Sequence, residues 1–159
     1  MKLLQERMAR QKIGESLIIQ TAVRLLVPFA QLFGLYVIVH GHYSPGGGFQ
    51  GGVILGASFV MLALAFDQQF SMRYMRESTN IRLGNIGPLI FVGTGALCAL
   101  FGGLFLDYSA LDVLIPLGPI AWRSFGIFVV EVGVGLGVMS IMVALFWVLG
   151  SNGNMDEGL

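Results

Sequence analysis

The chain has 159 residues, of which 55% are hydrophobic and 11% are charged, and its formal net charge is zero. A soluble domain carries about 25% charged residues, so this composition excludes an ordinary soluble fold. The mean hydropathy of +0.79 predicts a single membrane domain, and the absence of excess positive charge argues against nucleic-acid binding.

Residues 1–15 are polar and basic, and their apolar side chains recur at helical spacing. This pattern is typical of a short helix that lies on the membrane surface. A frayed basic tail explains the same composition equally well.

Four apolar segments follow, at about 17–40, 45–67, 84–106 and 120–149. About 20 apolar residues span a bilayer, and a spanning segment satisfies its own backbone only as a helix. The predicted fold is therefore all-α, a polytopic membrane protein with four transmembrane helices. The fourth segment is long enough to tilt or to project beyond the membrane.

The basic residues indicate the orientation of these segments. They gather in the N-terminal 15 residues and in the 68–83 connection, whereas the connection between the first two segments has no Lys or Arg. By the positive-inside rule, both termini are predicted to be cytoplasmic, in a multi-pass protein of the cell (inner) membrane.

Glycine dominates the start of the second segment, within the stretch HGHYSPGGGFQGG at residues 40–52. Gly48, Gly52 and Gly56 recur every four residues, which leaves one helix face as bare backbone for a close neighbour. Gly133 and Gly137 form a similar face on the fourth segment. We expect both faces to pack against other chains; exposed backbone N–H groups beside two histidines are the functional alternative.

The stretch HGHYSPGGGFQGG, with RLLVPFAQLFGLYVIVHGH leading into it, resembles the signature of the MnhB/MrpB family. Members of that family are small membrane subunits of Mrp-type multisubunit cation/proton antiporters, and related subunits occur in membrane-bound hydrogenases. The resemblance is specific over residues 18–66 and looser beyond. It implies a subunit that is not an enzyme, holds no cofactor or metal, and works with other antiporter subunits in the lipid bilayer on protons and Na+.

Glu131 stands in the middle of the fourth apolar segment. A charge at the bilayer centre costs about 3 kcal/mol, so this side chain is expected to face protein or water, or to be protonated. It shares a helix face with Gly135, Val138 and Met142, and it is the leading candidate for a proton path. The alternative is a buried acid that holds a neighbouring subunit. An apolar residue would be expected here in the antiporter subunits, so Glu131 brings the chain closer to the hydrogenase-type relatives.

Arg24 lies about a third of the way into the first segment. Gln20, Arg24, Pro28 and Gln31 fall on one helical face, and a polar stripe of this kind faces other helices rather than lipid. Arg24 either extends to the cytoplasmic surface or forms a buried ion pair.

Three further residues are candidates for an ion or proton path. His40 and His42 are expected at the outer boundary, and histidine is the residue type that can relay protons there, although histidines bonded to the loop backbone are the simpler interpretation. No other histidine is available to complete a zinc site. Asp67 ends the second segment, either as a solvated boundary residue or as an acidic ion entrance.

These ionisable residues are too few to form a transport path across about 30 Å of hydrocarbon. The sequence therefore predicts a subunit that contributes to a path shared with its neighbours and to their packing. The alternative is a membrane-arm subunit of an ion-pumping oxidoreductase, such as a membrane-bound hydrogenase. A stand-alone transporter and a purely structural subunit are two further hypotheses.

Overall fold

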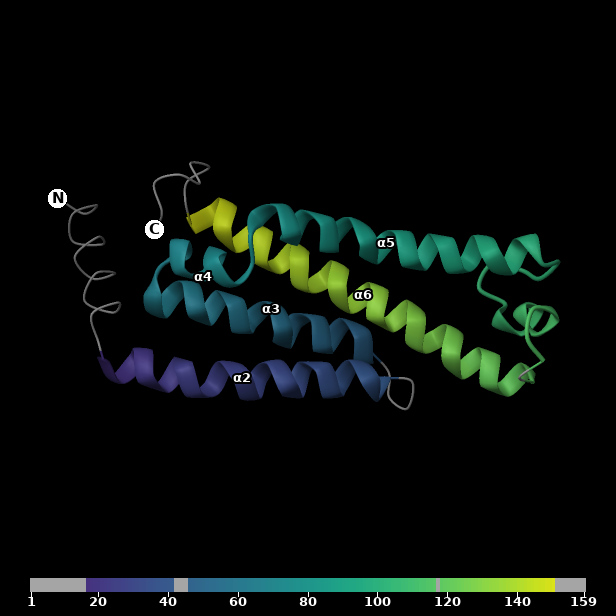
Figure 1. Ribbon diagram of the computed structural model, residues 1–159, viewed down its shortest axis with the longest axis horizontal. Helices are drawn as coiled ribbons and strands as arrows, with labels where there is room; N and C mark the ends of the chain where they lie inside the picture. The colour runs from purple at the N-terminus through teal and green to yellow at the C-terminus, as the bar shows by residue number, and fades with distance from the viewer. Residues whose placement is uncertain (1–16, 42–45, 117, 151–159) are drawn as a thin grey trace.

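Four long helices dominate the computed structural model, which describes residues 17–41, 46–116 and 118–150 (Figure 1). They are α2 (Leu17–Val39), α3 (Gly47–Phe66), α5 (Glu77–Leu100) and α6 (Pro119–Gly150). A short helix, α4 (Gln68–Tyr74), and a 3₁₀ helix, η2 (Tyr108–Val113), connect them.

All four long helices are long and apolar enough to cross a membrane, and no strand occurs among the described residues. The prediction of an all-α protein with four membrane-spanning segments is therefore confirmed. The surface helix expected over residues 1–15 lies outside the described part of the chain.

The long helices pack in the order α2, α3, α6, α5 (Figure 1). The main interfaces join neighbours in this row, so α3 and α6 form the middle of the molecule and α2 and α5 form its two edges. The largest cluster of buried side chains lies across the middle pair and includes Leu55, Met139, Val143 and Trp147.

The ends of α3 and α6 meet at one end of the molecule. Asp67 terminates α3 with a φ of 127°, and its Oδ1 accepts a hydrogen bond of 2.7 Å from the Gln68 backbone N–H at the start of α4. Gln68 is fully buried and donates through Nε2 to the Trp147 carbonyl at 3.4 Å. This contact places the end of α3 level with Trp147 on α6.

The third membrane helix, α5, begins and ends earlier in the chain than the segment predicted at 84–106. Helix α5 begins at Glu77, because polar residues continue a helix beyond the apolar stretch that a hydropathy count detects. It ends at Leu100, before Gly102 takes a φ of 85° that favours glycine. The connection predicted at 68–83 is consequently mostly helical, being α4 followed by the first turns of α5.

The opposite ends of α5 and α6 are covered by η2. Cys98, Leu111 and Trp122 form a second buried cluster there, with Tyr108 packed against it. The Trp122 indole N–H donates to the Ile115 carbonyl at 2.8 Å, which fixes the chain that follows η2 to the start of α6.

Candidate functional site

The glycine face of α3 lies directly on α6. A Cβ added to Gly48 would lie 2.5 Å from the Glu131 carbonyl oxygen, and one added to Gly52 would lie 2.6 Å from the Gly135 carbonyl oxygen. At Gly56 the corresponding distance is 3.3 Å to the Met139 carbonyl oxygen. Backbone therefore meets backbone along about two turns of both helices.

The glycines of α6 meet α5 in the same way. A Cβ on Gly133 would lie 2.9 Å from the Gly87 carbonyl oxygen, and one on Gly87 would lie 2.9 Å from the Gly137 nitrogen. We expected both glycine faces to pack against other chains. The structure uses them inside this chain, because α6 lies between α3 and α5 and requires a close approach on both sides.

The Glu131 carboxyl group extends from this interface to the turn that links α2 and α3. A Cβ on Gly41 would lie 2.5 Å from Glu131 Oε2 and 2.7 Å from Oε1, so the carboxyl group rests on the Gly41 backbone. The Oε2 atom is enclosed by protein, and the side chain as a whole is half-buried. Only glycine at position 41 leaves this space for the carboxyl group.

The structure also gives the depth of Glu131. Sixteen residues of α6 separate it from Trp147, which corresponds to about 24 Å along the helix. Glu131 is level with Gly48 at the start of α3, so a hydrocarbon core of about 30 Å that matches α3 would have Glu131 near its boundary rather than at its centre. The middle of α6 is not the middle of the membrane because this 32-residue helix is longer than a bilayer requires.

His40 precedes Gly41 and is exposed. Its Nδ1 lies 3.0 Å from the Tyr36 carbonyl oxygen, and its ring lies 4.1 Å from the Tyr36 ring centroid. A carbonyl oxygen only accepts, so Nδ1 carries the hydrogen in this contact. His42, the other predicted histidine, lies outside the described residues.

Arg24 lies at the other end of α2. Its guanidinium carbon is 5.0 Å from the centroid of the Phe66 ring, in the last turn of α3, and the side chain is exposed. This geometry is that of an arginine that reaches towards the membrane boundary.

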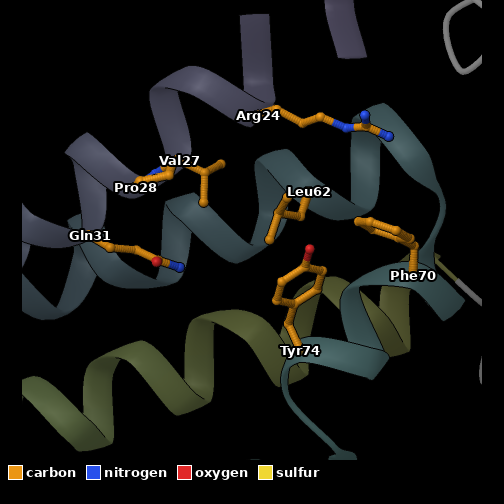
Figure 2. A pocket seen from close by; sticks show the side chains of 7 residues that line it. All are labelled: Arg24, Val27, Pro28, Gln31, Leu62, Phe70 and Tyr74. Atoms are coloured by element: carbon orange, nitrogen blue, oxygen red, sulfur yellow. The ribbon is translucent and has the colours of Figure 1, made fainter. Parts of the chain in front are cut away.

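Beside Arg24 is an open groove of about 400 Å³ between α2, α3 and α4 (Figure 2). Most of the predicted polar stripe of α2 faces it. The lining residues are Arg24, Val27, Pro28, Gln31, Leu62, Phe70 and Tyr74.

Asp67 is half-buried and acts as the N-cap of α4. Its φ of 127° is unusual for a residue other than glycine, and such strain costs roughly 1–3 kcal/mol. The structure therefore brings Glu131 towards the turn after His40, but it keeps Arg24 and Asp67 at the opposite end of the helices.

Two features were not anticipated from the sequence, namely the role of Gly41 and a buried polar pair between α5 and α6. Asn80 Nδ2 donates to the Ser140 carbonyl at 3.0 Å, and Ser140 Oγ donates in return to the Asn80 carbonyl. Asn80 is 1% exposed, although it was predicted to lie in a loop. The signal was its spacing from Gly84 and Gly87, which places the three residues on one helix face.

Comparison with known proteins gives a consistent result. The family profile described as "Domain related to MnhB subunit of Na+/H+ antiporter" matches residues 18–144. The chain is 35% identical over 144 residues to the B subunit of the Na(+)/H(+) antiporter of Bacillus subtilis (strain 168), covering 90% of this chain and 98% of that protein.

It is also 32% identical over 129 residues to the "Putative antiporter subunit mnhB2" of Staphylococcus epidermidis (strain ATCC 35984), covering 80% of this chain and 89% of that one. The same values hold for the protein with this name in Staphylococcus aureus (strain Newman). With four membrane-spanning helices and relatives of this kind over nearly its whole length, the chain belongs to the MnhB family of membrane proteins.

Proposed function

We propose that this chain is the small MnhB-type subunit of a multisubunit Na+/H+ antiporter, and that it contributes Glu131 to a proton or cation path shared with other subunits. It catalyses no chemical reaction in this proposal. Its partners are the other antiporter subunits and the lipid bilayer, and protons and Na+ are the transported ions. The family membership supports the assignment, since the named relatives are antiporter subunits.

The position of the Glu131 carboxyl group carries the mechanistic part of the proposal. It is the only acidic side chain described between Leu17 and Phe66 of the first helix pair or between Pro119 and Gly150 of α6. It occupies space that Gly41 leaves open, level with the first turn of α3. A carboxyl group there can exchange protons with the surface beyond the α2–α3 turn, whereas no second acid on α6 extends the path to the other end. The remainder of the path then belongs to neighbouring subunits.

Glu131 also has a structural interpretation, in which its carboxyl group holds a neighbouring chain. The two interpretations differ in what an amide would do. In the proposed role, Glu131→Gln leaves the complex assembled, because the amide keeps the shape and most hydrogen bonds, but lowers cation-dependent proton flux. In the structural role, Glu131→Gln leaves the proton flux nearly unchanged, and Glu131→Ala lowers the yield of the complex by removing the contact.

The experiment is a proton-flux assay in vesicles that contain the whole complex, combined with a measurement of complex yield. Glu131→Asp is expected to retain part of the flux with an altered pH dependence. Glu77→Gln, at the exposed start of α5, is the matched control for replacing a carboxylate by an amide. Normal flux in the Glu131→Gln complex would exclude proton transfer through this residue.

The proposed orientation has both termini in the cytoplasm, with the α2–α3 turn and η2 on the outer side. Single cysteines at Ser78 and Val113, both exposed, test it in a Cys98→Ala background. An impermeant thiol reagent added to intact cells should label Val113→Cys and leave Ser78→Cys unmodified. The reverse pattern would contradict the proposed orientation.

The alternative of a hydrogenase-type membrane arm makes a different prediction about composition. Such a complex contains redox subunits with iron–sulfur or nickel centres, whereas an antiporter does not require them. The gently solubilised complex should therefore contain transport subunits alone. Stoichiometric iron or nickel in the purified complex would favour the alternative.

A further inference from the structure

We propose that the groove between α2, α3 and α4 binds one anionic phospholipid, with its phosphate on Arg24 and Tyr74 and an acyl chain along the apolar floor. This inference goes beyond the proposed transport function and does not depend on Glu131. The groove lies at the end of the molecule opposite the Glu131–Gly41 contact.

The position of the groove matches the level of a lipid headgroup. Arg24 contacts the ring of Phe66, the last residue of α3, and α4 begins at Gln68. The mouth of the groove is therefore at the boundary where the membrane-spanning part of α3 ends. In the orientation proposed above, this is the cytoplasmic boundary, where anionic lipids give the membrane surface a negative potential.

The lining of the groove offers positive charge and hydrogen-bond donors, whereas the carboxylate of Asp67, between α3 and α4, caps α4 outside the lining. Arg24 is exposed and supplies guanidinium N–H groups that match a phosphate, while the Tyr74 hydroxyl points into the groove (Figure 2). No Asp or Glu is among the lining residues. Among the lining residues Arg24 carries the positive charge, because Arg73 and Arg76 line a separate depression with Gln69 and Met72. This charge is complementary to a lipid phosphate.

Beyond Arg24 the groove becomes apolar. Val27 and Leu62 are 6% and 5% exposed and form its floor, and Pro28 and Phe70 form its walls. Gln31 lies about two helical turns beyond Arg24, or about 10 Å further along α2 towards the membrane interior. The groove is thus polar at its mouth and apolar along its floor. This arrangement is complementary to an amphiphile that has a charged head and an aliphatic tail.

The volume is consistent with this ligand. About 400 Å³ lies within the range of pockets that bind small molecules. It accommodates a phosphate group and the upper part of an acyl chain, and the open side lets the chain continue along the exposed apolar surface of α2. Basic pockets between helices near the membrane surface bind lipid headgroups in this manner.

The test uses the intact complex in nanodiscs of phosphatidylcholine with or without phosphatidylglycerol, followed by native mass spectrometry of the lipids that remain bound. The wild-type complex should retain phosphatidylglycerol in preference to phosphatidylcholine. Arg24→Gln should weaken this retention about fivefold, the effect of one basic group near the membrane surface. The control Arg82→Gln removes an exposed arginine of α5 that does not line the groove and should change nothing.

Three results would overturn the proposal. One is equal retention of phosphatidylglycerol by the Arg24→Gln and Arg82→Gln complexes. Another is displacement of the lipid by inorganic phosphate, which would indicate a phosphate site rather than a lipid site. The third is a cross-link between Gln31→Cys and another subunit, combined with unchanged lipid retention in the Arg24→Gln complex. That result would show that a protein subunit, and not a lipid, occupies the groove. If Arg24→Gln fails to assemble, Tyr74→Phe removes only a hydroxyl from a 67% exposed side chain and should give a smaller loss of retention.

Discussion

The two packed faces of α6 differ in the polar groups that they bury. Towards α3, the backbones approach at Gly48 and Gly52, and the polar side chain of α6 at the edge of this contact is the ionisable Glu131. Towards α5, glycines again bring the backbones together, but the polar groups are the neutral Asn80 and Ser140, each bonded to the backbone of the other.

This difference suggests different roles for the two faces, which the proposed function assigns as structural towards α5 and functional towards α3. Neutral side chains that satisfy backbone carbonyls hold helices in register and have no charge to change. A carboxyl group in a similar interface carries a charge that can change, which is the property that the proposed function uses. The face towards α3 is therefore where we expect ion chemistry, and the face towards α5 is where we expect only stability.

The largest effect is expected from Gly52→Leu, which disrupts the α3 face itself. A Cβ there would already lie 2.6 Å from the Gly135 carbonyl oxygen, which is backbone and cannot move aside as a side chain would. Overpacking of this kind costs typically about 1–3 kcal/mol, and a leucine exceeds a single methyl group. Native gels should show loss of the complex. Gly93→Leu, at a position with nothing within 4 Å inside this chain, is the control, and an intact, equally heat-stable Gly52→Leu complex would refute close packing here.

A smaller effect is expected from Asn80→Ala, which removes one hydrogen bond from the α5 face. Interhelical hydrogen bonds in membranes contribute on average about 0.6 kcal/mol, and truncation of a buried side chain adds to that loss. The melting temperature of the complex should fall slightly, while the proton flux per assembled complex stays at the wild-type value. A flux defect at unchanged stability would show that the α5 face also takes part in transport.

The smallest change in stability is expected from Gly41→Ala. This substitution tests the carboxyl contact of the α3 face separately from its backbone packing. The added methyl group meets the Glu131 carboxyl group, the far end of a flexible side chain, so the helices need not separate. The stability should change by less than about 1 kcal/mol, whereas flux should fall because the carboxyl group is displaced. Gly48→Ala is the matched variant, since its methyl group meets the Glu131 backbone and should lower stability first. Identical stability and flux profiles for the two variants would contradict the distinction between carboxyl and backbone contacts.

The sequence predicted the four membrane helices because long apolar runs determine them with little help from tertiary structure. It also predicted that Gly135, Val138 and Met142 share a face with Glu131, which follows from helical periodicity. The structure places Val138 and Met142 against Gly52 and Gly56 of α3.

Periodicity could not indicate which helix each face meets. The glycine faces were assigned to other chains, since nothing in the sequence distinguishes an internal neighbour from an external one. The start of α5 was placed too late because hydropathy detects the apolar part of a helix and not its polar first turns. The contact of Glu131 with Gly41 depends on how far α3 and α6 are offset along their axes, which only the packed structure provides.

That offset has a consequence for the surrounding lipid. The start of α3 lies on Glu131, whereas the end of α5 meets α6 near Trp122, about 14 Å further along the helix. The apolar surface of the chain therefore does not end at one level. At the α5 edge it extends further towards the Trp122 end of α6 than it does at the α2 edge. A flat bilayer cannot match both heights, and such hydrophobic mismatch is relieved by tilting the protein or by local thinning of the membrane. The stability of the chain in a bilayer should consequently depend on the acyl-chain length of the lipid.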